Sequence, residues 1–350
     1  MSNTWGTNIK LAIFGESHGA AVGIMLDGLS AGFRIDFEMI ENEMKRRAPG
    51  GNEFSTPRKE VDEAEILSGL FNGRTTGAPL CAVIRNENTK SGDYEQNIFR
   101  PSHADFTAFY KYKGFADFRG GGHFSGRLTA PLVFAGAIAK QILLEKGIKI
   151  GARITSIHNV CDSDGDINQI TEISKKAFPT YSDELGNKMK EKILQAKNAG
   201  DSVGGIIECA AIGLEVGMGE PFFNGIESEI SHIMFSIPAV KGIEFGAGFD
   251  ITSMTGSEAN DQMHMKNDDI CFKTNNNGGI NGGITNGQPI VFRVAIKPTP
   301  TIKKAQTTVD INKRETITAE FGGRHDPCVV LRAVPVVEAC LALCLLNNKN

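Results

Sequence analysis

Residues 14–28, FGESHGAAVGIMLDG, decide how the chain begins to fold. Read alone, Gly15-Glu16-Ser17-His18-Gly19 fits the G-x-S-x-G nucleophile elbow, in which a serine lies on a sharp turn between a strand and a helix. The next residues, AAVGIMLDG, alternate apolar and small side chains and end in Asp-Gly, which predicts a second strand closed by a turn. The stretch therefore predicts a hairpin over residues 8–35. A strand after Ser17 does not fit a nucleophile elbow, so a serine hydrolase built on Ser17 is only an alternative hypothesis for the function.

The rest of the chain mixes helical and strand patterns. Residues 36–47 predict a short helix with Asp36 near its start, and residues 131–147 predict a buried helix ended by Gly147. Residues 86–119 show little regular periodicity. Further helices are predicted over 183–200, 224–237 and 326–346, the last with a candidate kink near Pro335, and strands over 66–73, 78–86, 204–215 and 289–298. This mixture predicts the α+β class, with helices layered against antiparallel sheets in one continuous domain over residues 1–350.

Composition narrows the class of protein. The chain has 350 residues, 41% hydrophobic and 22% charged, and its net charge of -4 disfavours a nucleic-acid or membrane-surface partner. Its seven cysteines form no C-x-x-C pair, and its seven histidines lack the spacing of a metal site, so no metal is expected. Without a signal segment or a membrane-length apolar run, the protein is expected to be cytoplasmic.

Four segments combine glycine with arginine, histidine, serine or aspartate. Glycine lets backbone N–H groups approach a ligand, and arginine binds phosphate or carboxylate through two parallel hydrogen bonds. An isolated glycine-rich turn is most often structural, but four such segments together predict a pocket for a small polyanion, with His18, His103 and Asp326 as candidate proton-transfer groups. The segments are Gly15–Gly19, Arg100–Asp105, Arg119–Arg127 and Gly322–Pro327.

Two nucleotide motifs and one other function class are disfavoured. The triple glycine at 120–122 fails the dinucleotide fingerprint because Ser125 stands where glycine is needed, and no G-x-x-x-x-G-K-[ST] loop occurs. Another hypothesis is a non-enzymatic module that binds RNA or an acidic partner through the arginine-rich loop. The net charge of -4 and the lack of aromatic residues interleaved with that loop disfavour it.

At these segments the chain closely resembles the chorismate synthases. The motifs FGESHG, FRPSHAD, SGRLTA, MGEP, KGIEFGAGF, GGINGGITNGQ, KPT and GRHDPCV occur in the family's order from about residue 7 to about residue 346. The resemblance implies a β-α-β sandwich fold, a homotetramer, and the elimination of phosphate from 5-enolpyruvylshikimate 3-phosphate to give chorismate. It also implies reduced FMN as cofactor, with NADPH as an indirect reductant and a possible separate flavin reductase as partner.

Carried over by position, the resemblance implies a role for each motif residue. His18 protonates the leaving phosphate, His103 supplies a proton to the flavin, and Asp326 assists removal of the ring hydrogen. Ser17 and Ser125 support these groups by hydrogen bonds. The implied substrate-binding residues are Arg47, Arg58, Arg100, Arg127 and Arg324, and the implied flavin-binding residues are His123, Ser125, Ala239, Gly282, Lys297, Pro298, Thr299, Pro300, Thr301 and Arg324.

The chain also departs from the family pattern. His123 and Phe124 stand in Gly-His-Phe-Ser-Gly-Arg where the family usually has Gly-Arg-Ser-Ser-Ala-Arg, so an arginine that helps to hold the flavin is replaced by His123. Pro238 replaces a usual asparagine, Ala48 a common arginine and Glu53 a frequent arginine. The flavin contact at residue 123 and the substrate contacts from residues 46–58 therefore involve side chains that differ from the family pattern.

Overall fold

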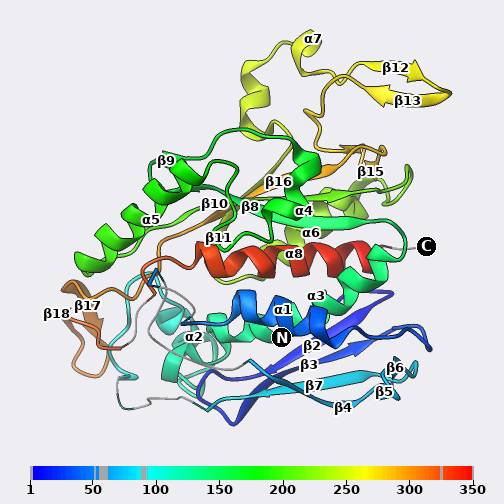
Figure 1. Cartoon of the computed structure of the whole chain (residues 1–350). Coiled ribbons are helices and arrows are strands. Elements are labelled where there is room, and N and C mark those ends of the chain that lie inside the picture. Colours follow the sequence, from blue (N-terminus) through cyan, green and yellow to red (C-terminus); the bar gives the residue numbers. More distant parts are fainter. Residues whose placement is uncertain are drawn as a thin grey trace.

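The chain forms two antiparallel sheets with a layer of helices between them (Figure 1). The computed structural model describes residues 3–50, 53–54, 62–87, 92, 94–323 and 326–348. Within these residues the first five-stranded sheet has the order β1 (Thr4–Trp5), β2 (Lys10–Gly15), β3 (Ala21–Asp27), β7 (Leu80–Arg85) and β4 (Ala64–Ser68). The second has the order β11 (Val240–Phe245), β16 (Ile290–Ile296), β10 (Gly205–Ile212), β8 (Lys149–Ile157) and β9 (Val160–Cys161). This is the predicted α+β arrangement.

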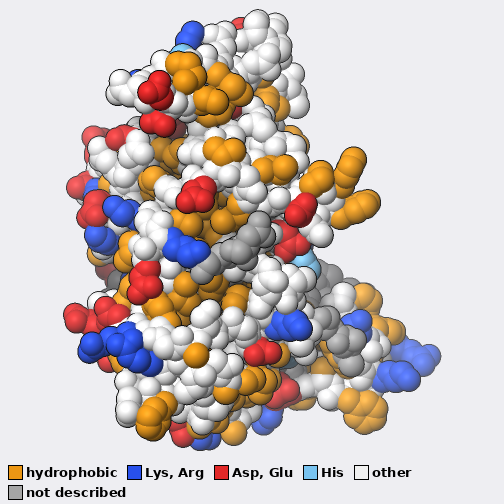
Figure 2. All heavy atoms as spheres, turned by 90° about the vertical axis from the view of Figure 1, so that its right-hand side faces the viewer, with side chains coloured by type: hydrophobic (Ala, Val, Ile, Leu, Met, Phe, Trp, Pro, Cys, Tyr) orange, Lys and Arg blue, Asp and Glu red, His pale blue; other side chains and the backbone are white. Residues whose placement is uncertain are grey.

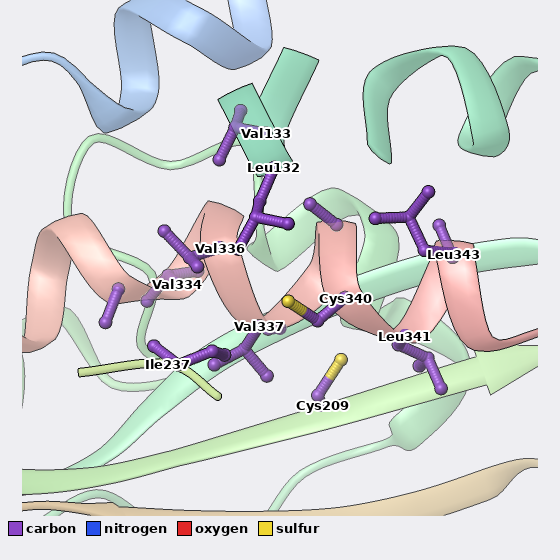
Figure 3. Packing of buried hydrophobic residues seen from close by; sticks show 14 of the residues in the cluster. Leu132, Val133, Cys209, Ile237, Val334, Val336, Val337, Cys340, Leu341 and Leu343 are labelled. Carbon is purple, nitrogen blue, oxygen red and sulfur yellow. The ribbon is translucent and has the colours of Figure 1, made fainter. Parts of the chain in front are cut away.

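The helix layer is built around α8 (Val330–Asn347), which packs against α1 (Phe37–Arg47), α3 (Thr129–Leu144) and α6 (Ile226–Met234). Every residue of α8 from 333 to 347 is buried. A Cβ on Gly136 would lie 2.2 Å from Cβ of Ala339, so only glycine allows α3 to approach α8 this closely. Figure 3 shows Leu132 and Val133 on one side of α8, and Cys209 and Ile237 on the other. The second sheet therefore packs against α8 through β8 and β10, whereas the first sheet packs against α3 through β3 and β7.

One buried carboxylate connects the helix layer to the second sheet. Glu338 of α8 accepts hydrogen bonds from Arg46 at 2.7 and 2.9 Å, from Lys140, and from the backbone N of Ala152 at 3.0 Å. Burial alone would raise the pKa of Glu338, but the charges of Arg46 and Lys140 lower it to about 2. Glu338 therefore stays ionised at neutral pH and joins α1, α3, α8 and β8.

The remaining elements surround this sandwich. The described part of the chain also contains α2 (Asp105–Lys111), α4 (Ile170–Ile173), α5 (Asp183–Asn198), α7 (Gly256–Ala259), and 3-10 segments over Arg119–Phe124, Gly126–Leu128, Ile167–Gln169, Phe222–Asn224 and Gly248–Ser253. Four two-stranded hairpins pair β5 (Leu70–Phe71) with β6 (Arg74–Thr75), β12 (Met263–Lys266) with β13 (Asp269–Phe272), β14 (Ile280–Asn281) with β15 (Ile284–Thr285), and β17 (Gln306–Asp310) with β18 (Glu315–Ala319). The β12–β13 hairpin projects from the body, and Figure 2 shows hydrophobic side chains gathered at that end of the molecule.

The structure confirms the strongest sequence patterns. The hairpin over residues 8–35 is β2 paired antiparallel with β3, and Asp36 caps α1 by accepting a hydrogen bond from Met39 N at 3.1 Å. The last helix begins at Val330 rather than at residue 326, and it continues through Pro335. The patterns missed α2 and β8. Seven residues are too few for α2 to show a helical period, and the polar residues of KIGARITSI hide a strand that is almost wholly buried.

Candidate active site

A three-glycine loop at residues 120–122 brings together segments that are far apart in the sequence. Gly120, Gly121 and Gly122 have φ angles of 60°, 85° and 53°, which side chains disfavour. A Cβ on Gly120 would lie 2.4 Å from Cδ2 and 2.5 Å from Nε2 of His18. A Cβ on Gly121 would lie 3.2 Å from Cε1 of His103. The loop therefore packs directly against both histidines that the sequence predicts as proton donors.

Ser17 lies in the turn that joins β2 to β3, beside the same loop. Its backbone N donates to Gly122 O at 3.0 Å, and its side chain is buried. Ser17 Oγ has no hydrogen-bond partner within the described residues. A nucleophile elbow requires a helix after the serine, whereas here the next element is strand β3. The geometry therefore does not support a serine hydrolase, and it leaves the hydroxyl available to a ligand.

His103 is held on one side by a charged pair. Its Nδ1 lies 2.6 Å from Oδ1 of Asp105, and Arg100 donates to the same carboxylate through Nε and Nη2, each at 2.7 Å. Burial would raise the pKa of Asp105, but hydrogen bonds from Arg100 and His103 lower it well below its usual range. Asp105 fixes the Nδ1 side of the His103 ring. The other ring nitrogen, Nε2, therefore faces the glycine loop.

The turn predicted to contact the flavin is tied to the segment that carries His103. Lys297 Nζ donates to Ser102 O at 2.7 Å, and Lys297 N donates to Ala239 O at 2.9 Å. Ser102 and Ala239 have φ angles of 60° and 76°, a backbone conformation that costs a non-glycine residue about 1–2 kcal/mol. Such strain concentrates at functional sites, and here it marks two residues that one lysine connects.

Two predicted substrate-binding arginines, Arg47 and Arg127, meet at an aspartate that the sequence analysis did not single out. Arg47 ends α1, Arg127 lies in the 3-10 segment before α3, and both are buried. The carboxylate of Asp62 accepts from Arg47 Nη1 at 2.6 Å and from Arg127 Nη1. Asp62 belongs to no motif, so no local signal in the sequence identifies it.

Asp326 lies just before α8 and is connected to the same cluster. Its Oδ2 accepts from Arg332 Nη1 at 2.8 Å, and its buried Oδ1 has no partner in the part of the chain that the structure describes. Arg332 Nε also donates to Arg47 O at 3.1 Å. Burial raises the pKa of Asp326, although Arg332 and Arg47 oppose this shift. A buried carboxylate with a raised pKa and an oxygen that lacks a partner accepts a proton more readily than an exposed carboxylate does.

His123 and Ser125, which follow the three glycines, each form a hydrogen bond with the backbone of a neighbouring segment. Ser125 Oγ accepts a hydrogen bond from Arg127 N at 3.3 Å, so it caps the turn before α3. His123 Nδ1 lies 2.8 Å from Gly15 O, at the start of the turn that carries Ser17 and His18. His123 therefore connects the glycine loop to that turn.

Gly282 lies at the other end of β16 from the turn 297–301. Gly282 lies in the turn of the β14–β15 hairpin before β16, whereas Lys297 follows β16, a strand about 20 Å long. The described residues show no hydrogen bond between Gly282 and residues 297–301. Arg58 and Arg324 lie outside the described residues, so their predicted roles stay predictions.

A cavity of about 180 Å³ opens beside His103. Its polar wall includes Arg100, His103 and Asp105, and its apolar wall includes Tyr94, Phe109, Phe118 and Phe124. The cavity therefore combines apolar surface with charged groups, as expected where a small molecule is bound and oriented. Within the described residues, no group of three His, Cys, Asp or Glu side chains is arranged to hold a metal ion.

Residues 120–127 lie between the two histidines and the arginine cluster, which consists of Arg47 and Arg127 around Asp62. Gly120 and Gly121 contact His18 and His103, and Gly126 O accepts a hydrogen bond from Arg47 Nη2 at 2.8 Å. The site can therefore bind an anion through arginine, donate a proton through histidine and accept one at Asp326.

Comparison with known proteins decides which family uses this arrangement. The sequence model of the family described as chorismate synthase matches residues 9–349. The chain is 47% identical over 348 residues to a chorismate synthase of Porphyromonas gingivalis, covering 98% of this chain and 94% of that one. The chain belongs to the chorismate synthase family. A chorismate synthase of Dehalococcoides mccartyi is 45% identical over 350 residues, covering 99% of this chain and 96% of the relative.

A solved structure agrees with the sequence comparisons. A crystal structure described as chorismate synthase superposes with a TM-score of 0.76 at 30% identity, covering 98% of this chain and 92% of that chain. The predicted fold class and the predicted family are therefore confirmed. So is the predicted function as a chorismate synthase, a lyase of the shikimate pathway, and nothing in the comparisons favours a serine hydrolase.

Two segments of the chain, Arg119–Leu144 and Val330–Asn347, are long and apolar enough to cross a membrane by length and composition. Both are mostly buried inside the fold, where α3 and α8 form the helix layer. Their apolar character is therefore explained by the core that they build.

Proposed function

We propose that this chorismate synthase eliminates phosphate and a ring hydrogen from 5-enolpyruvylshikimate 3-phosphate with reduced FMN bound. The observation that carries the proposal is the glycine loop, which collects His18, His103 and the arginine cluster from segments far apart in the sequence. A substrate with one phosphate and two carboxylates matches a site in which several arginines converge.

The protein groups have distinct tasks in this proposal. His18 donates a proton from its ring to the departing phosphate, and the glycine loop holds that ring by close contact. Asp326 accepts the ring hydrogen as a proton at Oδ1, while Arg332 fixes Oδ2. His103 moves a proton through Nε2, because Asp105 and Arg100 hold its Nδ1 side. Burial of Ser17 and Asp326 keeps these transfers away from bulk water.

The residues present fit a flavin at the turn 297–301. The hydroxyl oxygens of Thr299 and Ser17 are both buried, and neither has a hydrogen-bond partner in the described part of the chain. Both can therefore form a hydrogen bond with a ligand. Lys297, Thr299 and Ala239 would hold the cofactor, and Lys297 is bonded to Ser102, the residue before His103. Reduced FMN, when bound, supplies the electron density that assists the elimination. Flavin contacts of His123 and Gly282 belong to the proposal on resemblance alone.

The wider setting is proposed on the same basis. Resemblance supports a cytoplasmic homotetramer that receives reduced flavin from NADPH through a separate reductase. One cluster of buried side chains, from Ile9 to Leu346, supports a single domain over residues 1–350. Size-exclusion chromatography with light scattering would measure the oligomeric state.

The proposal is tested by an anaerobic assay with reduced FMN and 5-enolpyruvylshikimate 3-phosphate. Release of phosphate together with chorismate absorbance supports it. Folded protein, verified by circular dichroism, that releases neither product refutes it. Omitting the reduced flavin is the control, because the proposal requires activity to disappear without it.

A further inference from the structure

The carboxylate of Asp62 lies between two guanidinium groups in the interior of the protein. Its Oδ2 accepts from Arg47 Nη1 at 2.6 Å, and its Oδ1 accepts from Arg127 Nη1. The side chains of Arg47, Asp62 and Arg127 are only 3%, 1% and 2% exposed. The three residues come from the end of α1, the approach to β4 and the turn before α3, so the carboxylate joins three separate segments.

The other nitrogens of the two arginines are also held by the protein. Arg47 donates through Nε to Thr129 Oγ1 at 3.2 Å and through Nη2 to Gly126 O at 2.8 Å. Arg127 donates through Nε to Asn86 Oδ1 at 3.0 Å and through Nη2 to the carbonyl of residue 85 at 3.1 Å. Each guanidinium is therefore held at every nitrogen, and among the described residues Asp62 is the one group that bonds to both.

Charge explains why the pair needs a shared carboxylate. Burial lowers the pKa of Arg47 to about 10, and the nearby charges of Arg332 and Arg127 act in the same direction, whereas Asp62 opposes them. Burial would raise the pKa of Asp62, but Arg47 and Arg127 lower it below its ordinary value, so the carboxylate is ionised at neutral pH. Two buried cations without that anion would repel each other and separate.

We propose that Asp62 is a positioning residue for the substrate's anionic groups, because it holds Arg47 and Arg127 side by side in one fixed orientation. This inference rests on the proposed function, in which these arginines bind the substrate. Asp62 touches neither substrate nor cofactor in this role; it acts through the two arginines. The opposite possibility is that Asp62 competes with the substrate for the same donors, and the two possibilities predict changes in substrate affinity of opposite sign.

The test compares Asp62→Asn, Asp62→Glu and a surface control. Glu65→Gln makes the same carboxylate-to-amide change three residues away, in an exposed ion pair with Arg85. Substrate Kd is measured by calorimetry with 5-enolpyruvylshikimate 3-phosphate, and KM and kcat by the anaerobic assay. We expect Asp62→Asn to raise Kd and KM at least about tenfold, the scale of one charge-assisted hydrogen bond, with a smaller change in kcat. Glu65→Gln should stay within about twofold of the wild type.

Asp62→Glu keeps the test decisive if Asp62→Asn fails to fold, since removing one partner of a buried ion pair is strongly destabilising. It retains the charge but displaces it by one methylene, so we expect a smaller rise in KM, of about threefold to tenfold, at nearly unchanged kcat. Thermal unfolding would verify that each variant is folded.

Three results would overturn the inference in an active wild-type background. They are tighter substrate binding in Asp62→Asn, an unchanged KM in the folded variants, and a loss confined to kcat. An inactive wild-type protein would refute the proposed function instead, so the two failures are distinguishable.

Discussion

Replacing Gly120 with alanine should inactivate the enzyme far more than it destabilises the fold. Gly120 has a φ of 60°, where a side chain costs about 1–2 kcal/mol, partly offset by about 0.4–1 kcal/mol from the stiffer unfolded chain. The new Cβ would also lie 2.4 Å from Cδ2 of His18, whereas carbon atoms in contact are about 3.5–4 Å apart. The ring of His18 must therefore move by about 1 Å.

A displacement of that size in a catalytic group costs about 10²-fold in rate. Gly73→Ala is the matched control, because Gly73 has a φ of 73° and a Cβ there would meet no atom within 4 Å beyond its chain neighbours. Both variants should lose about 1 kcal/mol of unfolding free energy from backbone strain, with a further loss in Gly120→Ala from the contact. Only Gly120→Ala should lose activity.

The measurements are thermal unfolding by calorimetry and single-turnover phosphate release under anaerobic conditions. Single-turnover rates are needed because product release can otherwise hide a slower proton transfer. A Gly120→Ala variant that turns over within about threefold of the wild type would refute the assignment of His18 as a proton donor held by this loop.

Three further predictions concern the proton-transfer groups and the flavin. His18→Ala and Asp326→Ala should each slow turnover by about 10²-fold or more in the anaerobic assay, and a near-wild-type rate in either would contradict its role. Arg332→Met removes a positive charge that lowers the pKa of Asp326, so the pKa of Asp326 should rise further. The acidic limb of the kcat/KM profile should then move to higher pH. An unmoved limb would count against Asp326 as the proton acceptor. His123→Arg should tighten FMN binding by about tenfold in a fluorescence titration, because it adds a charged donor, and an equal Kd would show that residue 123 does not contact the flavin.

Sequence patterns predict the parts of this fold that are local. FGESHGAAVGIMLDG shows strand alternation after the serine, which predicts the β2–β3 hairpin and argues against a nucleophile elbow. Residues 131–147 are apolar on most faces, which predicts the buried helix α3. In both cases the residues that determine the element are neighbours in the sequence.

The pairing of charges in the candidate site could not be predicted in this way. Arg47 bonds to Thr129 across 82 positions, and Arg46 bonds to Glu338 across 292. Asp62 has no repeating pattern around it, and its role follows only from where α1, β4 and the turn before α3 meet. Motifs identify the arginines, but only the packed structure identifies the carboxylate that holds them.

The central place of α8 has a consequence for biosynthesis. Ribosomes add about 5–20 residues per second, and α8 is made after every other described element, including all strands of both sheets. Because α8 packs against β8 and β10 of the second sheet, the nascent chain exposes the apolar inner face of that sheet until α8 emerges. We therefore expect the late nascent chain to engage chaperones that bind apolar segments.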